Sequence, residues 1–360
     1  MRIVITGGHH NSALVIAEKL KQKGHEIIWF GHKYSMVGDK NFSAEYLEVT
    51  KKNFLFVEIR AGKWQPNSRF IKNLIKIPLG FVASFFALLK YKPDLIYSSG
   101  GYLALPVAVC GWVLKIPVAT HEQTIIAGSA NKLIAKFAKK TLLTYPASLN
   151  YYPAKKAKVV GMPLREEIFK GEKKYFDNNK PTIYITGGKQ GAHLINEEIF
   201  NILPQLLAKF NVIHQCGSTS LFNDFKKAEE LLTDSKNYIV KDYFFSEEIG
   251  SIFKEADFVV SRSGAHIVYE LLALRKPAIL IPIPWSSNDE QYENAKMLQN
   301  YGLAKILPQE ELGKGKLLAT ILEFYENLPT ETVLKNLPEV EKNSGDKIVV
   351  EIENILKHGR

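Results

Sequence analysis

Short apolar runs alternate with longer amphipathic stretches along the chain. Runs of apolar and β-branched residues predict strands, and stretches with apolar positions three and four residues apart predict helices, for example at 13–23 and 130–139. The strands predicted for the first part of the chain are residues 2–6, 27–30, 55–59, 95–97, 118–120, 141–143 and 159–160. This alternation is typical of a parallel sheet covered by helices.

A turn and a polar stretch interrupt the alternation once. Gly161-Met-Pro163 is followed by the polar residues 170–180, and apolar runs then resume at residues 182–186, 212–215, 238–240, 258–260 and 278–281. Because each set of strands is large enough for its own sheet, we predict an α/β fold with two doubly wound domains. The predicted domains are residues 1–162 and 163–342.

The composition agrees with two ordinary globular domains. The 360 residues are 46% hydrophobic, which is enough to fill two cores. Cys110 and Cys216 lie far apart in apolar surroundings, so the sequence indicates neither a disulfide framework nor a zinc cluster, and it suits the cytosol. The chain begins directly with a strand-like run, without a charged region followed by an apolar one, so we expect no secretory signal.

Charge is distributed unevenly along the chain. Residues 1–160 hold 23 Lys and Arg against 8 Asp and Glu, a net charge of +15, whereas residues 161–360 hold 24 against 29, a net charge of −5. The first part therefore attracts anions. Nucleic acid, an anionic membrane surface and a phosphorylated substrate all suit such a field, and charge alone does not choose among them.

One apolar segment of the basic part bears on that choice. Residues 77–89 form an uncharged run of 13 residues within the segment 69–92, and this run is too short for the ~20 residues that span a bilayer. Lys72 and Lys76 share a predicted helix face beside apolar positions, which suits a helix lying at a membrane headgroup interface. A helix buried in the core explains the run equally well.

The region after residue 257 carries the clearest chemical pattern. The apolar run Phe258-Val-Val260 precedes Ser261-Arg-Ser-Gly-Ala-His266, so the sequence predicts a strand, a tight turn and the start of a helix. Backbone N–H groups at such a helix start bind phosphate, and small residues let a diphosphate approach the backbone. Glu270, one to two turns into the helix, is placed to accept both hydroxyls of a ribose. This pattern predicts a nucleotide-sugar site.

Two glycine turns, one in each predicted domain, share this strand, turn and helix setting. Thr6-Gly-Gly-His-His10 suits a phosphate or a substrate oxygen, although a simple tight turn explains two glycines as well. Gly187-Gly-Lys-Gln-Gly-Ala192 adds Lys189, which is either a solvated loop residue or a cation that meets a diphosphate. Neither turn has the G-x-G-x-x-G spacing, so a dinucleotide-dependent oxidoreductase is disfavoured.

Six short motifs together resemble the successive signatures of the MurG family. Each motif is weak by itself, but the six follow one another in order over nearly the whole chain, which makes the combined signal specific. The motifs are Ser99-Gly-Gly-Tyr102 with Pro106, His121-Glu-Gln123 with Ala127-Gly128, Gly161-Met-Pro-Leu-Arg165, Gly187-Gly-Lys-Gln-Gly-Ala192 with Asn196, Ser261-Arg-Ser-Gly-Ala265 with Glu270, and Gln291 with Asn294-Ala295.

The resemblance implies a GT-B glycosyltransferase, in which two Rossmann-like domains face a cleft and a last helix, here 343–358, returns to the first domain. The implied reaction moves N-acetylglucosamine, with inversion, from UDP-N-acetylglucosamine to the 4-hydroxyl of the muramoyl peptide of lipid I, forming lipid II for peptidoglycan. The implied partners are UDP-N-acetylglucosamine, the undecaprenyl-diphosphate-linked lipid I and the anionic cytoplasmic face of the cell membrane, where the protein is peripheral. No nucleic acid or cofactor is implied. No metal is implied either, because a helix terminus can neutralise the leaving diphosphate.

The resemblance also implies roles for residues. His9 is the first candidate for the catalytic base and Glu122 the second. A His9 that caps the turn or binds the acceptor phosphate without transferring a proton, and a structural Glu122, remain open alternatives. The implied UDP-sugar contacts include Arg165, Lys189 and Gln190. Of the others, Phe245 and Ser246 are implied near the uracil, Glu270 at the ribose and Gln291 at the sugar hydroxyls. The contacts implied at the diphosphate are Ser263, Gly264, Ala265 and His266. Implied acceptor contacts are Thr6, Gly7, Gly8, Tyr102, Thr124 and Asn196.

The chain departs from the family pattern mainly in its first part. Val4-Ile5 replace the first two glycines of the family's opening turn, and His10-Asn11-Ser12 stand where an apolar run with proline is usual. Thr124-Ile125 replace the usual Asn and Gly. Two alternatives therefore stay open: a GT-B enzyme that transfers from a UDP-sugar to another lipid or glycan, and a noncatalytic relative that binds a nucleotide sugar.

Overall fold

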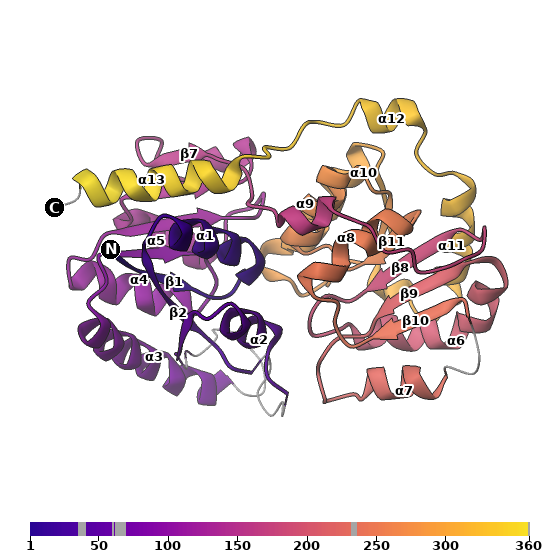
Figure 1. Ribbon diagram of the computed structural model, residues 1–360, viewed down its shortest axis with the longest axis horizontal. Helices are drawn as coiled ribbons and strands as arrows, with labels where there is room; N and C mark the ends of the chain where they lie inside the picture. Colours follow the sequence, from indigo (N-terminus) through magenta and orange to yellow (C-terminus); the bar gives the residue numbers. More distant parts are fainter. Residues whose placement is uncertain (35–40, 60, 62–69, 232–235, 359–360) are drawn as a thin grey trace. The chain divides into compact units, whose positions relative to one another are not determined.

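The computed structural model describes residues 1–34, 41–59, 61, 70–231 and 236–358, without the side chains of 70–76, 287 and 358. It consists of two compact units (Figure 1). Unit 1 is formed by Met1–Tyr34, Phe42–Leu164 and Glu341–Arg360, and unit 2 is built on Arg165–Val340. Each unit contains one parallel sheet with its own core, so the predicted α/β class with two doubly wound domains is confirmed.

Unit 1 alternates strands and helices from its first residue. Its elements are β1 (Arg2–Thr6), α1 (His10–Gln22), β2 (Glu26–Gly31), α2 (Ala44–Lys51), β3 (Leu55–Glu58), α3 (Phe70–Tyr91), β4 (Leu95–Ser98), α4 (Ala104–Val113), β5 (Val118–Glu122), α5 (Ser129–Phe137), β6 (Lys140–Leu143), the 3-10 helix η1 (Pro146–Tyr151), β7 (Ala157–Val159) and the C-terminal α13 (Ser344–His358).

The sheet of unit 1 is wound in two directions from its centre. The strand order is β3-β2-β1-β4-β5-β6-β7, and all neighbours are parallel. The winding direction reverses between β1 and β4, which leaves room for a ligand at the carboxyl ends of these strands. The turns that follow β1 and β4 meet there, because Ser99 N–H donates to Thr6 Oγ1 at 3.2 Å.

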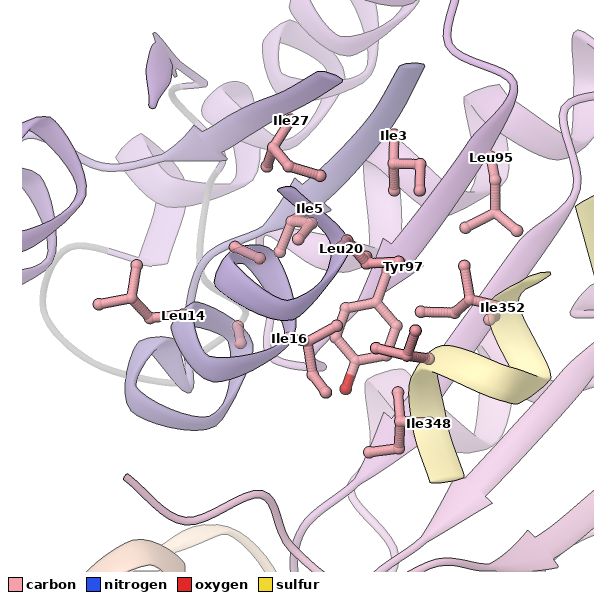
Figure 2. Packing of buried hydrophobic residues seen from close by; sticks show 14 of the residues in the cluster. Ile3, Ile5, Leu14, Ile16, Leu20, Ile27, Leu95, Tyr97, Ile348 and Ile352 are labelled. Atoms are coloured by element: carbon pink, nitrogen blue, oxygen red, sulfur yellow. The ribbon is translucent and has the colours of Figure 1, made fainter. Parts of the chain in front are cut away.

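Helices cover both faces of this sheet. The apolar sides of α1 and α13 form one core cluster with β1, β2 and β4, and α3 and α4 pack in a second cluster on other strand positions. Ile348 and Ile352 of α13 are fully buried in the first cluster, near Ile16 of α1 and Tyr97 of β4 (Figure 2). The last helix of the chain is therefore part of the core of the first unit.

Unit 2 repeats the alternation. Its elements are η2 (Glu166–Phe169), β8 (Thr182–Thr186), α6 (His193–Lys209), β9 (Asn211–Gln215), α7 (Asp224–Glu230), β10 (Tyr238–Lys241), α8 (Ser246–Glu255), β11 (Phe258–Ser261), α9 (Ala265–Leu274), β12 (Ala278–Leu280), η3 (Ser287–Asp289), α10 (Glu290–Asn300), β13 (Ala304–Ile306), η4 (Gln309–Glu311), α11 (Lys316–Glu326) and α12 (Glu331–Lys335).

The sheet of unit 2 has the order β10-β9-β8-β11-β12-β13, again with parallel neighbours. The winding direction reverses between β8 and β11, so the ligand crevice expected of such a sheet lies at the carboxyl ends of these two strands. β13 was not predicted from the sequence, because it is three residues long with a lysine at its centre and lacks an apolar run.

The buried face of α13 gives a direct test of its role. Ile352→Ala removes a side chain with no exposed surface from the first core cluster, so we expect the free energy of unfolding of unit 1 to fall by about 2–5 kcal/mol. The control Val350→Ala truncates a side chain of the same helix that is 48% exposed, and we expect a change within about 0.5 kcal/mol. Urea unfolding measures both; equal losses would contradict the packing described here.

Candidate functional site

Two helices of unit 2 begin at the point where the sheet reverses its winding. β8 and β11 are neighbours in the sheet, and α6 and α9 follow them after the turns 187–192 and 262–264. Both helices are described over their whole length, and neither has an acidic residue in its first turn or a side chain that caps it. The positive ends of two helix dipoles are thus suited to bind an anion.

Glycines in the two turns serve different purposes. Gly191 has φ +83°, and a Cβ there would lie 2.0 Å from Cys216 O, because the turn packs tightly against the turn that follows β9. At Gly264, by contrast, a Cβ would meet nothing within 4 Å. The protein itself therefore requires glycine at residue 191, whereas the space before α9 is open to the close approach of a ligand.

The side chain of Arg262 ties the turn before α9 to neighbouring segments of unit 2. Its guanidinium donates to Ile281 O at 3.1 Å and to Gln309 Oε1 at 2.7 Å. Burial lowers the pKa of Arg262 to about 10. Asn294 of α10 adds a second support by donating to Ser263 O at 3.2 Å. Both residues belong to motifs quoted from the sequence, but motif spacing does not reveal that their side chains turn into the unit and hold the loop.

Three residues predicted to contact the UDP-sugar come together beside α9. Arg165 Nη2 lies 2.9 Å from Glu270 Oε1, and Arg165 Nη1 lies 3.4 Å from Ser246 Oγ at the start of α8. The side chains of Arg165 and Glu270 are only 9% and 5% exposed. A buried carboxylate needs such a partner, since an unpaired one pays a large desolvation penalty. The pair thus fixes Glu270 near the helix end that suits a diphosphate.

The remaining predicted donor residues lie around these helix ends. Gln291, the second residue of α10, accepts a hydrogen bond from Ile283 N at 3.2 Å, which ties α10 to the loop after β12. Lys189 is partly exposed and Gln190 exposed in the turn before α6, where Ser218 N donates to Lys189 O at 2.9 Å. The others are Phe245 at the N-cap of α8 and Ala265 and His266 in the first turn of α9.

In unit 1, the predicted glycine turn lies between β1 and α1 and is held by the neighbouring turn. Ser99 Oγ donates to Thr6 O at 2.7 Å. Gly8 has φ +122°, and a Cβ there would meet Gly100 O at 3.0 Å, so the two glycine turns touch. His9 follows as the N-cap residue of α1 and is partly exposed. The structure thus brings Thr6, the two glycines and His9 to the carboxyl edge of the sheet.

Tyr102 lies beside this turn, on the segment that follows β4. Its ring stacks on His32 with 5.4 Å between ring centroids, and 39% of its surface is exposed. Partial burial and the Glu45 carboxylate raise the pKa of Tyr102 to about 12, so its hydroxyl stays protonated and can donate a hydrogen bond at neutral pH.

Glu122, at the end of β5, is enclosed by hydrogen-bond donors. Its two carboxylate oxygens accept hydrogen bonds from Gln123 N, Thr124 N, Thr124 Oγ1, Gly128 N, Asn131 Nδ2 and Tyr152 Oη, at distances of 2.5–3.2 Å. The residue is 3% exposed. A buried carboxylate that accepts so many hydrogen bonds is a strong structural anchor. The geometry therefore favours the structural alternative that the sequence left open.

Two residues predicted to contact the acceptor form hydrogen bonds within the protein instead. Thr124 is 2% exposed, and its hydroxyl lies 2.8 Å from Glu122 Oε1 and 2.5 Å from Ile126 O. Asn196 of unit 2 has no exposed surface; its amide donates to Cys216 O and Asp224 Oδ2 and accepts from His214 Nε2. Both side chains are thus part of the framework, which corrects the expectation that they face a ligand.

The architecture of two doubly wound units, one with open helix N-termini at its reversal point, is that of GT-B nucleotide-sugar glycosyltransferases. Residues 4–143 match the glycosyltransferase family 28 N-terminal domain, and residues 182–348 match the glycosyltransferase family 28 C-terminal domain. The chain belongs to the MurG family within this group.

Curated relatives match the chain over most of its length. A UDP-N-acetylglucosamine--N-acetylmuramyl-(pentapeptide) pyrophosphoryl-undecaprenol N-acetylglucosamine transferase of Clostridium perfringens (strain SM101 / Type A) is 36% identical over 342 residues, covering 91% of this chain and 90% of the relative. The protein of the same name from Clostridium botulinum (strain Langeland / NCTC 10281 / Type F) is 32% identical over 367 residues, covering 98% of each.

Solved structures share the fold. MurG of Acinetobacter baumannii has a TM-score of 0.66 at 24% identity, covering 98% of this chain and 99% of that one. A UDP-GlcNAc 2-epimerase of Neisseria meningitidis bound to UDP-GlcNAc has a TM-score of 0.66 at 15% identity, covering 98% and 100%. At these identities the likeness establishes the GT-B fold alone.

The histidine within the Asn196 network makes stability depend on pH. Burial lowers the pKa of His214 to about 3, against about 6.5 in an unfolded chain. Below pH 6.5 the unfolded state gains a proton that the folded state does not. The free energy of unfolding therefore decreases as the pH is lowered, by at most about 1.4 kcal/mol per pH unit for this group. We expect His214→Gln to lose less stability than the parent between pH 7 and pH 5 in thermal unfolding. Parallel curves for the two proteins would exclude this contribution.

Proposed function

We propose that the chain transfers N-acetylglucosamine from UDP-N-acetylglucosamine to the 4-hydroxyl of the muramoyl peptide of lipid I, forming lipid II. The reaction is inferred from membership of the MurG family. At the level of residues, the observation that supports it is the buried Arg165–Glu270 pair beside the open N-terminus of α9. A diphosphate and a ribose need these two features, an array of N–H groups and a fixed carboxylate, at neighbouring positions.

The donor is held by unit 2 in this proposal. The N-terminus of α9 binds the diphosphate, with the turn before α6 as a second donor of N–H groups and positive charge. Glu270 accepts the ribose hydroxyls, and Gln291 contacts the sugar. The residues assigned to the donor are Arg165, Lys189, Gln190, Phe245, Ser246, Ser263, Gly264, Ala265, His266, Glu270 and Gln291.

The chemistry is an in-line displacement at the anomeric carbon. The acceptor's 4-hydroxyl oxygen forms a bond to that carbon while the bond to the UDP oxygen breaks, so the configuration inverts and the bonding electrons leave with UDP. The helix N–H groups stabilise the negative charge that grows on the diphosphate. A base takes the hydroxyl proton, and in this proposal that base belongs to unit 1.

His9 is the base in this proposal. Imidazole is the side chain that most readily exchanges a proton near neutral pH, and His9 stands partly exposed at the N-cap of α1. Glu122 is surrounded by donors and serves to hold the loop after β5. Thr6, Gly7, Gly8 and Tyr102 line the acceptor side and Thr124 supports it from within, whereas Asn196 belongs to the framework of unit 2.

A different acceptor is the second candidate, and one contact favours it. A Cβ on Gly7 would lie 1.8 Å from Glu45 Oε1, so a carboxylate lies against the glycine turn. A negative charge at this position weakens the binding of an anionic lipid diphosphate. A UDP-sugar transferase with a neutral or cationic acceptor group at this turn accommodates Glu45 more readily.

The transfer assay separates these functions. The purified protein is incubated with labelled UDP-N-acetylglucosamine and a lipid I analogue, and we expect a β-linked disaccharide product to appear together with equimolar UDP. UDP release without transfer to the analogue would favour the other-acceptor candidate. Binding without UDP release would contradict a transferase and leave a noncatalytic nucleotide-sugar binder.

Attachment to the cytoplasmic membrane face is part of the proposal. Leu79, Val82 and Phe86 of α3 are 53–64% exposed, and Trp112 and Val113 of the adjoining α4 are each 57% exposed. Among the described residues, no helix combines the length and apolar character needed to cross a bilayer. We call these five side chains the apolar patch. Amphipathic surfaces of this kind bind at the headgroup boundary, and basic residues add attraction to anionic lipid.

The sequence left two explanations for this segment, and the described part of α3 has one buried and one exposed apolar side. Phe81, Phe85 and Leu88 pack in the core of unit 1, while Leu79, Val82 and Phe86 lie on the exposed side of the helix. Residue 69 lies outside the described residues, and the side chains of Lys72 and Lys76 lie outside them as well. Their part in membrane binding stays a prediction.

A single carboxylate tests the donor site. Glu270→Ala removes the proposed ribose contact, and we expect the affinity for UDP to fall by ~1–3 kcal/mol because charge-assisted hydrogen bonds are lost. Glu326→Ala, an exposed position on α11, is the control and should bind UDP as the parent does. Calorimetric titration gives both affinities, and thermal unfolding verifies that each variant is folded. An unchanged affinity for Glu270→Ala would mean that the donor binds elsewhere.

The apolar patch gives a separate prediction. Phe86→Ser with Trp112→Ser removes two of its large side chains, so we expect cosedimentation with vesicles of anionic phospholipid to fall at least tenfold. Leu221→Ser changes an apolar residue of unit 2 that is 46% exposed and should leave cosedimentation unchanged. Equal binding of all three proteins would place the membrane contact elsewhere.

A further inference from the structure

Gln215 is the last residue of β9, the strand that lies between β8 and β10 in the sheet of unit 2. It stands opposite Thr186, the last residue of β8, and opposite Lys241, the last residue of β10. The chain after β8 is the diphosphate turn, residues 187–192, and the chain after β10 leads into the uracil segment, residues 243–246. Gln215 therefore lies between the two segments proposed to contact opposite ends of UDP.

The side-chain amide of Gln215 bonds to both segments. Its Nε2 donates to Thr186 Oγ1 and to Gly188 O, each at 3.0 Å, and its Oε1 accepts from Phe244 N at 3.0 Å. These partners allow one orientation of the amide, because Gly188 O can only accept a hydrogen bond and Phe244 N can only donate one. The residue is 4% exposed. A single buried amide thus joins the diphosphate turn to the uracil segment.

The bond to Gly188 O also affects the N–H groups of the diphosphate turn. Ser218, further along the loop that follows β9, holds the next carbonyl, since its backbone N–H donates to Lys189 O at 2.9 Å. A peptide unit is planar, so a fixed carbonyl also fixes the N–H group of the residue that follows it. The N–H groups of Lys189 and Gln190 therefore take their directions from the chain at the end of β9.

The bond from Phe244 N anchors the start of the uracil segment. The Phe244 ring is 1% exposed and packs edge-on against Tyr184 of β8, with 6.3 Å between the ring centroids. Phe245, the next residue, is the N-cap of α8, and Ser246 Oγ lies 3.4 Å from Arg165 Nη1. The anchored residue is thus followed directly by the two residues that are assigned to the neighbourhood of the uracil.

We propose that Gln215 is a positioning residue that sets the separation between the diphosphate turn and the uracil segment, so that one UDP molecule contacts both. The inference rests on the proposed donor site of unit 2. Uridine needs only the uracil side of that site, whereas UDP gains affinity from the second segment only when the two are correctly spaced. An amide that served the fold alone would change stability but not the ratio of these two affinities.

The test replaces Gln215 by methionine, which is similar in length and volume but has no amide. Affinities for UDP and for uridine are measured on the whole chain by displacement of labelled UDP-N-acetylglucosamine. We expect the affinity for UDP to fall about tenfold, because the spacing of the two segments is no longer held by hydrogen bonds. The affinity for uridine should change by less than about threefold, because uridine does not bridge the two segments.

Asn211, the first residue of the same strand, provides the matched control. It is 1% exposed, and its amide donates to Asn178 Oδ1 at 2.9 Å and to Lys180 O at 3.0 Å, at the amino end of β9. Asn211→Leu removes a buried amide as Gln215→Met does, so thermal unfolding should show a loss of stability for both variants. Only Gln215→Met should weaken the binding of UDP.

Thr186→Val keeps the inference testable if Gln215→Met does not fold. Thr186 Oγ1 accepts from Gln215 Nε2 and from Gly188 N, both at 3.0 Å, so valine removes one of the bonds that hold the diphosphate turn. We expect the affinity for UDP to fall about three- to fivefold in this variant, while that for uridine stays as in the parent.

Glu270→Ala in the same displacement assay separates the inference from the proposed function. An unchanged affinity for UDP in Glu270→Ala would overturn the donor site itself. If Glu270→Ala weakens UDP binding while Gln215→Met and Thr186→Val bind UDP as the parent does, only the positioning role is overturned. Equal losses for UDP and uridine in Gln215→Met, or an equal loss for UDP in Asn211→Leu, would also overturn it, because the effect would then lie in the uracil segment alone or in general stability.

Discussion

Parallel strands that all end at the same edge of a sheet are the constraint on which the functional surface of this protein depends. In each unit the winding direction reverses at the centre of the sheet, between β1 and β4 and between β8 and β11. The turns that follow these strands are drawn together there, although they are far apart in the sequence. Helices α1, α6 and α9 begin at these points, so the N–H groups and dipoles at each sheet edge are placed where we propose that a phosphorylated ligand binds.

Polar groups buried behind the turns hold this surface in shape. Arg165 pairs with Glu270 in unit 2, and Glu122 gathers the loop after β5 in unit 1. Such groups cost desolvation free energy unless every donor and acceptor finds a partner, so they tolerate few arrangements. Because these buried groups tolerate few arrangements, they also make the turns rigid. Loops that would otherwise be mobile are thereby prepared for a substrate before it binds.

The sequence predicted the α/β class, most of the strands and the turn before α9, because apolar runs and glycine turns are local signals. It missed β13, which is too short to show a pattern, and it did not distinguish the buried from the exposed side of α3. Asn196 shows a deeper limit. Its position in a motif suggested a ligand contact, but the side chain lies in an internal network whose partners come from β9 and α7. Partners distant in sequence cannot be derived from spacing.

The central claim is that the open helix ends of unit 2 form the donor site. A crystal structure with UDP-N-acetylglucosamine tests it most directly. The account predicts diphosphate oxygens within hydrogen-bonding distance of the backbone N–H groups at Gly264–His266, and ribose hydroxyls on the Glu270 carboxylate. A nucleotide bound instead at the glycine turn of unit 1, with Glu270 still paired only to Arg165, would contradict it.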